Sequence, residues 1–482
     1  AQGAWRFRAP LVWTMTDVPL ALAGNELSLQ TSAHNTYREE GVCEAASGEP
    51  TRAANDSEAA RWQSAWELRK NLGGLWQRPP GGLGCLDGLR AIAVVWVVSY
   101  HCFVLFRGMG TGSPEFQLLA NSFAMQLALS GDLGVDMFFV LSGFLIALQG
   151  VKELRRTGKI HYFGFLWARW WRIVPTYWAA IAINVMFDIL GARDACSSSI
   201  WGNLLFVNNM QDHDLGVPGH PVCLMWTWSI GLEFQFYFLT PVVILMCCRS
   251  DGSLRRCAFP ILLCLGAVFL AIRCAIYFTL TEGGKPPPQM TNVLWTRGHT
   301  YLAGVGACLA YHAKMGREPS VGYRVFYRIV DLLAALACVG IAFVGNGMDT
   351  TRLVTRFSPD LGVFLIVCSQ GLFACAVAWG AFRATSGEAP WLDRILSAKI
   401  LVPLARLSYS AYLMQMLAIS PLMDHWDVFR PDYSYWMCLL VWILFFVSAI
   451  SLVFLVALVH HLVFEAPSLN LRKYVTPRCL QR

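Results

Sequence analysis

Three ionisable side chains lie inside one apolar run near the start of the hydrophobic part of the chain. Asp87, Arg90 and His101 belong to the stretch 86–101, which is otherwise rich in valine, isoleucine and alanine. Arg90 and His101 are eleven residues apart, so on a helix they share one face, with His101 roughly 16 Å further along. Because histidine is the usual general base near neutral pH, this spacing predicts acid–base chemistry. The alternative is that both side chains only bond neighbouring helices and hold them together.

Two carboxylates in later apolar runs are candidate partners of this histidine. Asp136 lies inside the second run, and Glu233 lies about one turn inside the far end of the fourth. Either one can orient an imidazole and stabilise its charged form, as the third member of a catalytic triad does. The sequence leaves the choice open, and the alternative role of Asp136 is to pair with an arginine on a neighbouring helix.

Two arginines at the start of the third run are candidates for binding an anionic group. Arg169 and Arg172 are three residues apart and are therefore neighbours on one helix face. Paired guanidinium groups suit phosphates, and Arg90 is predicted to lie between this pair and the histidine. The alternative is a topology anchor, because tryptophans suited to a membrane interface flank both arginines.

The elements that must position these residues are membrane helices. Of the 482 residues, 56% are hydrophobic and 14% are charged, whereas a soluble protein carries about 25% charged residues. Together with long apolar runs, this composition predicts an all-α polytopic membrane protein, a bundle of about ten transmembrane helices. The ten runs are approximately 89–106, 132–149, 172–190, 229–247, 258–280, 297–313, 329–345, 361–381, 400–421 and 436–463.

The positions of basic residues predict how the chain is divided and oriented. We expect a polar N-terminal extension over 1–80, with a short amphipathic helix near 58–72, then a transmembrane domain over 81–470 and a basic tail over 471–482. Eighteen lysines and arginines lie in the gaps and tail on one side of the predicted bundle, and six lie on the other. This bias predicts that both termini lie on the cytoplasmic or equivalent side. The net charge of +7 is therefore a topology signal, and we expect no nucleic-acid partner.

The sixteen cysteines are not arranged as a metal site. Most of them lie inside apolar runs, where cysteine behaves as a small hydrophobic residue, and no spacing typical of metal ligands appears. Cys196 and Cys223 lie in the longest far-side loop. They can pair if that side is oxidising, or remain two free thiols.

Several motifs occur in an order that resembles a known family. The chain is similar to the acyltransferase-3 family of integral-membrane O-acyltransferases over roughly residues 84–470. The motifs are Asp87-Gly88-Leu89-Arg90 followed by His101, the stretch 134–146, Arg169-x2-Arg172, the stretch 228–237, the stretch 406–413, and Phe464-Glu465-Ala466-Pro467.

The resemblance implies an enzyme that moves an acyl group, commonly acetyl, from acyl-CoA to a hydroxyl of a carbohydrate or lipid-linked acceptor, without a metal. It makes His101 the essential histidine, with Arg90 in the same motif, and matches Arg169 and Arg172 to the arginine pair that serves the CoA end. We expect Arg90, Arg169 and Arg172 to be the cofactor-binding residues. Many members have a histidine where this chain has Gln415, and glutamine can form hydrogen bonds but cannot titrate.

Combining these interpretations, we expect one pore whose two ends receive the two substrates, with His101 as general base deep inside it. Two other functions remain open. One is a catalytically silent structural or assembly subunit of a larger membrane complex, and the other is a small-solute transporter, which discontinuous helices and internal symmetry would favour.

Overall fold

The computed structural model describes most of the chain, with gaps. The described residues are 63–78, 82–109, 113–190, 196, 199–211, 223–281, 289–314, 321–344, 359–425 and 433–477. Within them the chain is helical apart from turns, loops and one isolated bridge between Cys248 and Leu254. The fold class is therefore all-α. The predicted N-terminal extension is described only over residues 63–78.

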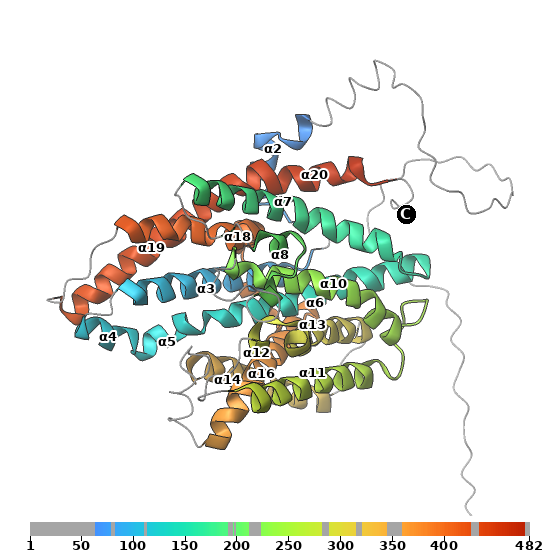
Figure 1. Cartoon of the computed structure of the whole chain (residues 1–482). Coiled ribbons are helices and arrows are strands. Elements are labelled where there is room, and N and C mark those ends of the chain that lie inside the picture. Colours follow the sequence, from blue (N-terminus) through green and yellow to red (C-terminus); the bar gives the residue numbers. More distant parts are fainter. Residues whose placement is uncertain are drawn as a thin grey trace, which may run out of the picture. The chain divides into compact units, whose positions relative to one another are not determined.

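Long helices of 20 to 29 residues form the bundle (Figure 1). Each of the ten predicted runs falls largely on one of them. They are α3 (Gly84–Met109), α6 (Leu133–Thr157), α7 (Tyr162–Leu190), α10 (Trp228–Cys247), α11 (Ala258–Leu280), α13 (Leu294–Lys314), α14 (Val321–Val344), α16 (Pro359–Thr385), α18 (Leu401–His425) and α19 (Tyr435–His460).

Seven segments of the described chain are long and apolar enough to cross a membrane. They include α3, α6, α10, α11, α14, α16 and α19, whereas α7, α13 and α18 are as long but are not among them. The protein is therefore a multi-pass membrane protein, and the count of about ten spans stays a prediction for those three helices. These three helices are less apolar for a physical reason. They carry several of the arginines and tyrosines that the bundle buries, and these residues lower the mean hydropathy of the helices.

Short elements join the long helices. They are α2 (Leu68–Gly74), α4 (Pro114–Ala120), α5 (Phe123–Leu129), η1 (Ser130–Asp132), α8 (Ile200–Leu204), α9 (Asn208–Met210), η3 (Met225–Thr227), α12 (Gln289–Asn292), α17 (Pro390–Leu396), η4 (His461–Glu465) and α20 (Ala466–Val475). We call the end of the bundle at which α3 begins the near end, and the opposite end the far end.

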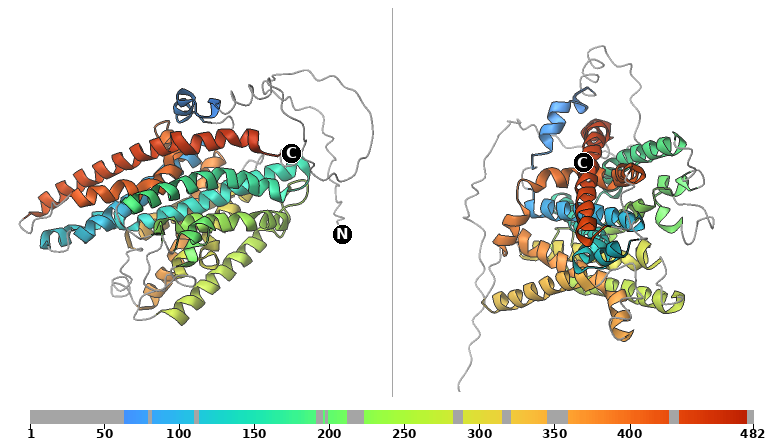
Figure 2. Two further views of the ribbon diagram at one scale, coloured as in Figure 1. Left: turned by 45° about the horizontal axis from the view of Figure 1, so that its top comes forward. Right: turned by 90° about the vertical axis from the view of Figure 1, so that its left-hand side faces the viewer.

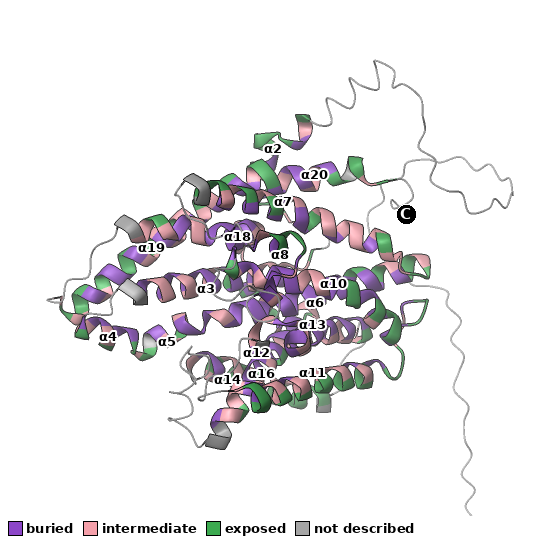
Figure 3. Cartoon of the chain, in the orientation of Figure 1, coloured by how far each residue is buried: buried purple, intermediate pink, exposed green. Residues whose placement is uncertain are grey.

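The centre of the bundle is the crossing of α6 and α13, both of which are largely buried (Figure 3). Gly143 of α6 lies directly against the backbone of Tyr301, and Gly304 of α13 lies directly against the backbone of Val140. A side chain at either glycine would collide with the facing helix. Small residues let helices approach closely inside a membrane, so this pair sets the spacing of the two central helices.

A glycine of the Asp87-Gly88-Leu89-Arg90 motif lets α3 approach a neighbouring helix closely in the same way. Gly88 faces the backbone of Leu396 at the end of α17, where a Cβ atom could not fit. The helix then packs on α6 and α18, which carry many of the polar residues described below. The glycine of the Asp-Gly-Leu-Arg motif is therefore a packing residue, and it brings Asp87 and Arg90 against the interior of the bundle.

The outer helices expose apolar side chains. Leu263 of α11 and Leu333 of α14 are 73% and 59% exposed, and Figure 3 shows mostly exposed and intermediate residues on α11. A soluble protein rarely exposes such continuous apolar surface, whereas lipid tails cover it without cost.

A charged network ties α14 to the bundle. Arg383 of α16 donates from Nε and Nη2 to the two oxygens of Asp331 in α14, both at 2.9 Å. Trp379 donates to the same carboxylate at 2.7 Å, and Arg383 also bonds Glu388. Charges inside a membrane protein need such partners, and here they attach an otherwise peripheral helix.

The far end carries a disulfide and a layer of amide side chains. Cys196 and Cys223 form a disulfide bond, which is the first of the two alternatives that the sequence left open. Beneath it, Asn203 donates to the hydroxyls of Tyr177 and Thr227 at 3.0 and 3.3 Å. Because buried backbone and side-chain polar groups require partners in a membrane, this layer allows an irregular loop to pack into the bundle.

Candidate active site

A cavity of about 300 Å³ opens among α3, α6, α7, α10 and α18. Its size is at the low end of the range for small-molecule sites. Four arginines, two carboxylates and several neutral polar side chains line it. These residues are Arg90, Arg169, Arg172, Arg406, Asp87, Glu233, Ser142, Gln149, Ser229, Tyr237, Ser408, Tyr409 and Tyr412.

The charge of the cavity wall favours an anion. Arg90, Arg169 and Arg172, the three arginines predicted from the sequence, come together there. Arg406 joins them from α18, whereas only Asp87 and Glu233 carry negative charge. Arg169 is buried and bonds Gln149, while Arg172 is exposed. An excess of fixed guanidinium groups in a low-dielectric wall attracts phosphate-bearing molecules.

Buried guanidinium nitrogens around the cavity also have unused hydrogen-bond donors. Within the described ranges of the chain, Nε of Arg169, Nε of Arg406 and Nη2 of Arg78 are each buried without a hydrogen-bond partner. A buried donor left unpaired costs free energy. The donor set therefore fits an anionic molecule with several acceptor oxygens, such as the phosphate groups of acyl-CoA.

Glu233 belongs to this cavity rather than to the surroundings of the histidine. Its Oε1 accepts hydrogen bonds from the Ser142 hydroxyl at 2.6 Å and from the Tyr237 hydroxyl at 2.5 Å. Ser142 lies near the middle of α6, so Glu233 lies deeper than one turn from the far surface. Two fixed donors hold its carboxylate among the arginines.

His101 lies on α3 beyond the cavity, and one of its ring nitrogens has two fixed neighbours. Nδ1 lies 3.0 Å from the carbonyl oxygen of Val97 and 3.1 Å from Oε1 of Gln415. A carbonyl oxygen can only accept, so Nδ1 carries the proton and donates it. Nε2 then has a free lone pair, which is the form that a general base requires.

Gln415 is itself fixed in orientation. Its Nε2 donates to the carbonyl oxygen of Tyr412 at 3.1 Å, one turn earlier on α18. This bond leaves Oε1 pointing at the imidazole, and the side chain is fully buried. We expected Asp136 or Glu233 to orient His101. In the described part of the chain neither is hydrogen-bonded to it, and the neutral amide of Gln415 takes that place.

The cavity does not reach His101, in contrast to the single pore expected from the sequence. Its wall includes Phe138, Ser229 and Tyr412. The Tyr412 hydroxyl lies 2.6 Å from the Ser229 hydroxyl and donates to the carbonyl oxygen of Trp226 at 2.6 Å. The Phe138 ring packs edge-on against Tyr412, with 6.3 Å between centroids. Tyr412 lines the cavity one helical turn before Gln415, whereas His101 and Gln415 are not part of the cavity wall.

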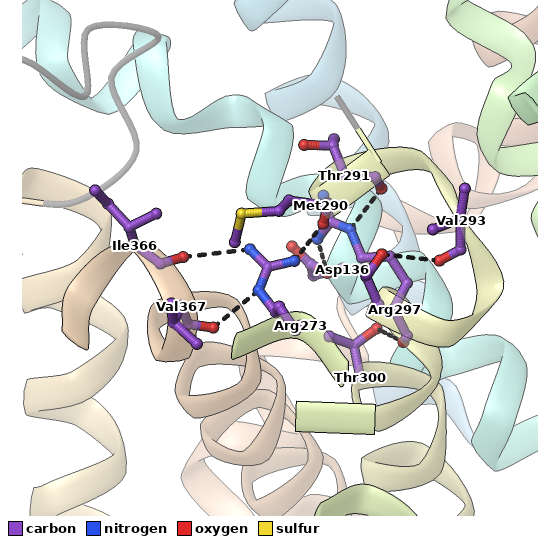
Figure 4. Close-up of polar contacts among 10 residues, drawn as sticks. Asp136, Arg273, Met290, Thr291, Val293, Arg297, Thr300, Ile366 and Val367 are labelled. Carbon is purple, nitrogen blue, oxygen red and sulfur yellow. Dashed lines mark hydrogen bonds and ion pairs between the residues drawn. The ribbon is translucent and has the colours of Figure 1, made fainter. Parts of the chain in front are cut away.

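Asp136 pairs with an arginine from another helix (Figure 4). Its Oδ1 accepts from Nη1 of Arg297 in α13 at 2.6 Å, and both side chains are at most 1% exposed. Arg297 also donates to the carbonyl of Thr291, while Arg273 of α11 donates to carbonyls of Met290, Ile366 and Val367. These bonds satisfy backbone carbonyls of α12 and α16, so the position of Asp136 matches its structural alternative.

Three residues around this site were not candidates from the sequence. Arg406 stands at the start of the motif 406–413, so a basic residue inside a motif was the available signal. Tyr412 follows in the same motif, but nothing in it indicates that a tyrosine closes a cavity. Arg78 lies outside all of the motifs, and no signal pointed to it. Among the described residues, no group of histidines, cysteines and carboxylates is arranged to hold a metal ion.

Comparisons with known proteins agree on one family. The acyltransferase-3 family, an acyltransferase domain, matches residues 83–461. Nose resistant to fluoxetine protein 6 of Caenorhabditis elegans is 23% identical over 80% of the chain and 50% of its own length. Peptidoglycan O-acetyltransferase OatA of Listeria monocytogenes is 24% identical over 72% of the chain and 51% of its own length.

A third relative matches a smaller part of the chain at a higher sequence identity. O-acetyltransferase OatA of Staphylococcus aureus is 31% identical over 34% of the chain and 25% of its own length. The chain thus spans about half the length, or less, of these curated relatives. No solved structure matches it significantly. The family match covers most of the chain and all but the last of the motifs described above, so this multi-pass membrane protein belongs to the acyltransferase-3 family.

Proposed function

We propose that the protein is a membrane O-acyltransferase that moves an acyl group, such as acetyl, from acyl-CoA to a hydroxyl of a carbohydrate or lipid-linked acceptor. The observation that carries this proposal is the arrangement of two sites along α3. A cationic cavity lies at the near end, and a histidine with a free Nε2 lies about three turns further along. Family membership and the names of the O-acetyltransferase relatives support the reaction class.

The donor enters the cavity from the near end. Its phosphate groups accept hydrogen bonds from Arg90, Arg169, Arg172 and Arg406, and its pantetheine arm points toward Tyr412. Glu233, held by Ser142 and Tyr237, fixes the positions of the guanidinium groups by its charge. This assignment keeps the three sequence-predicted arginines as donor-binding residues and makes Glu233 a member of the donor site.

The acceptor approaches His101 from the far end. Nε2 takes the hydroxyl proton while the hydroxyl oxygen attacks the thioester carbonyl carbon. The carbon–sulfur bond then breaks, and the proton passes from the imidazole to the departing thiolate. The products are the O-acyl ester and CoA, and no covalent acyl-enzyme is required. For the thioester to reach His101, the rings of Phe138 and Tyr412 must turn aside.

A transfer assay tests the base. In membrane vesicles containing the protein and radiolabelled acetyl-CoA, His101→Ala should lower transfer by at least about 100-fold, the usual contribution of a positioned general base. His161→Ala is the matched control, because His161 lies between α6 and α7 and bonds Glu153. Near-normal turnover by a correctly inserted His101→Ala protein would contradict the assignment.

The same assay tests the donor site. Joint replacement of Arg169 and Arg172 by alanine should raise the KM for acetyl-CoA by about tenfold or more and leave the KM for the acceptor nearly unchanged. Equal losses for both substrates would indicate a purely structural arginine pair.

A further inference from the structure

A segment that precedes the family match packs against the near end of the bundle. Residues 63–78, which include α2, lie before residue 83, where the match begins. Trp66 donates to the carbonyl of Val463, and Asn470 of α20 donates to Ala65 and Asn71. Figures 1 and 2 show α2 beside α20. These contacts hold the segment in a defined position.

The end of this segment touches two residues of the donor cavity. The carbonyl of Gln77 accepts a hydrogen bond from Nη2 of Arg406 at 3.1 Å. Nε of Arg78 lies 3.2 Å from Oδ2 of Asp87. Asp87 and Arg406 both line the cavity, so residues outside the family match reach its wall.

The Arg78–Asp87 pair changes the electrostatics of the cavity. Asp87 is one of its two carboxylates, and alone it would repel an anionic ligand and compete for Arg90. Arg78 offsets that charge. Its side chain is 26% exposed, but its Nη2 is buried and has no hydrogen-bond partner among the residues that the structure describes. A guanidinium that already bonds a carboxylate through Nε can still offer this nitrogen to a second acceptor.

We propose that Arg78 is a donor-binding residue, which neutralises Asp87 and presents Nη2 to a phosphate group of the acyl donor at the mouth of the cavity. This inference rests on the proposed function, because it names a further residue of the same donor site. It also gives the segment 63–78 a role, since its contacts with η4 and α20 hold the segment that carries Arg78.

The test compares donor affinity and turnover in the 482-residue chain. Arg78→Ala should raise the KM for acetyl-CoA by about tenfold, the effect expected from one lost charge-assisted contact, with kcat within twofold. Arg78→Lys should recover part of the affinity, because lysine keeps the charge but not the fork. Arg69→Ala is the control, since Arg69 lies exposed on α2.

A double variant separates this role from a structural one. If Asp87 opposes the donor, Arg78→Ala combined with Asp87→Asn should bind acetyl-CoA more tightly than Arg78→Ala alone. A merely loosened segment would give no such recovery. Unchanged KM in Arg78→Ala, or no recovery in the double variant, would overturn the inference.

A second readout does not depend on turnover. Acetyl-CoA should raise the melting temperature of the detergent-solubilised protein, and Arg78→Ala should require about tenfold more ligand for the same shift. If the unaltered protein shows neither transfer nor a shift with acetyl-CoA, the proposed function fails and the inference fails with it. If the unaltered protein responds and Arg78→Ala responds equally, the inference alone fails.

Discussion

The imidazole of His101 is oriented by neutral acceptors. The carbonyl of Val97 and the amide of Gln415 share Nδ1, and both favour the tautomer whose Nε2 is free to accept a proton. The family resemblance implies a histidine in many members where this chain has Gln415, and the amide oxygen of Gln415 can still accept the hydrogen bond from Nδ1. Holding the ring requires an acceptor, not a second base.

This geometry predicts the effect of removing the amide. Gln415→Leu should lower kcat by about tenfold, within the range for lost orienting partners, because Val97 still accepts from Nδ1. The KM for acetyl-CoA should stay unchanged. Gln370→Leu is a suitable control, since Gln370 is a buried glutamine on α16. A change in KM without a change in kcat would place Gln415 in substrate binding instead.

The sequence predicted which helix faces carry the residues of the site better than it predicted which residues those side chains contact. Helical spacing placed Arg90 and His101 on one face of one helix, and Arg169 with Arg172 on one face of another. It could not predict that Gln415, 314 residues away, lies against His101, or that Asp136 faces Arg297. Periodicity states which face of a helix is buried, but not which helix covers that face.

At the scale of elements, one ion pair joins the two central helices. Asp136 and Arg297 connect α6 with α13 where both are buried. Replacing Asp136 by asparagine leaves a buried guanidinium without its countercharge. Loss of one partner of such a pair costs about 3–5 kcal/mol. The thermal stability of the solubilised protein should therefore fall markedly.

Two further variants check this explanation. Asp331→Asn should cost less, because that carboxylate is 37% exposed and its partner Arg383 also bonds Glu388. Combining Asp136→Asn with Arg297→Gln should recover much of the lost stability, since position 297 then no longer carries a charge that lacks its partner. If the double variant is as unstable as Asp136→Asn, the buried charge is not the cause.

The helices themselves were largely predictable, because apolar runs of membrane length leave few alternatives to a helix. The close packing of these helices against one another could not be predicted from the sequence. Gly143 and Gly304 read as ordinary small residues in the sequence, and only the facing backbones show why no side chain fits there.

At the scale of the whole molecule, the two ends of the bundle differ in chemistry. The far end carries the Cys196–Cys223 disulfide, and such bonds persist in oxidising compartments. The predicted excess of basic loop residues lies at the near end. We therefore expect the near end to face the cytoplasm or its equivalent.

Cysteine labelling measures this orientation. Cys257 is exposed and directly precedes α11 at the near end. In sealed vesicles with the outer face exposed, a membrane-impermeant maleimide should leave Cys257 unlabelled until detergent is added. Cys257→Ser identifies the signal. Labelling before permeabilisation would reverse the predicted topology.

The contacts of residues 63–78 have a practical consequence for anyone who trims the protein to its family match. A version limited to residues 83–461 loses Gln77 and Arg78 at one terminus and Asn470 at the other. Arg406 and Asp87 would then lose partners at the cavity wall. An inactive truncated protein would consequently say nothing about His101, and measurements of catalysis need both flanking segments in place.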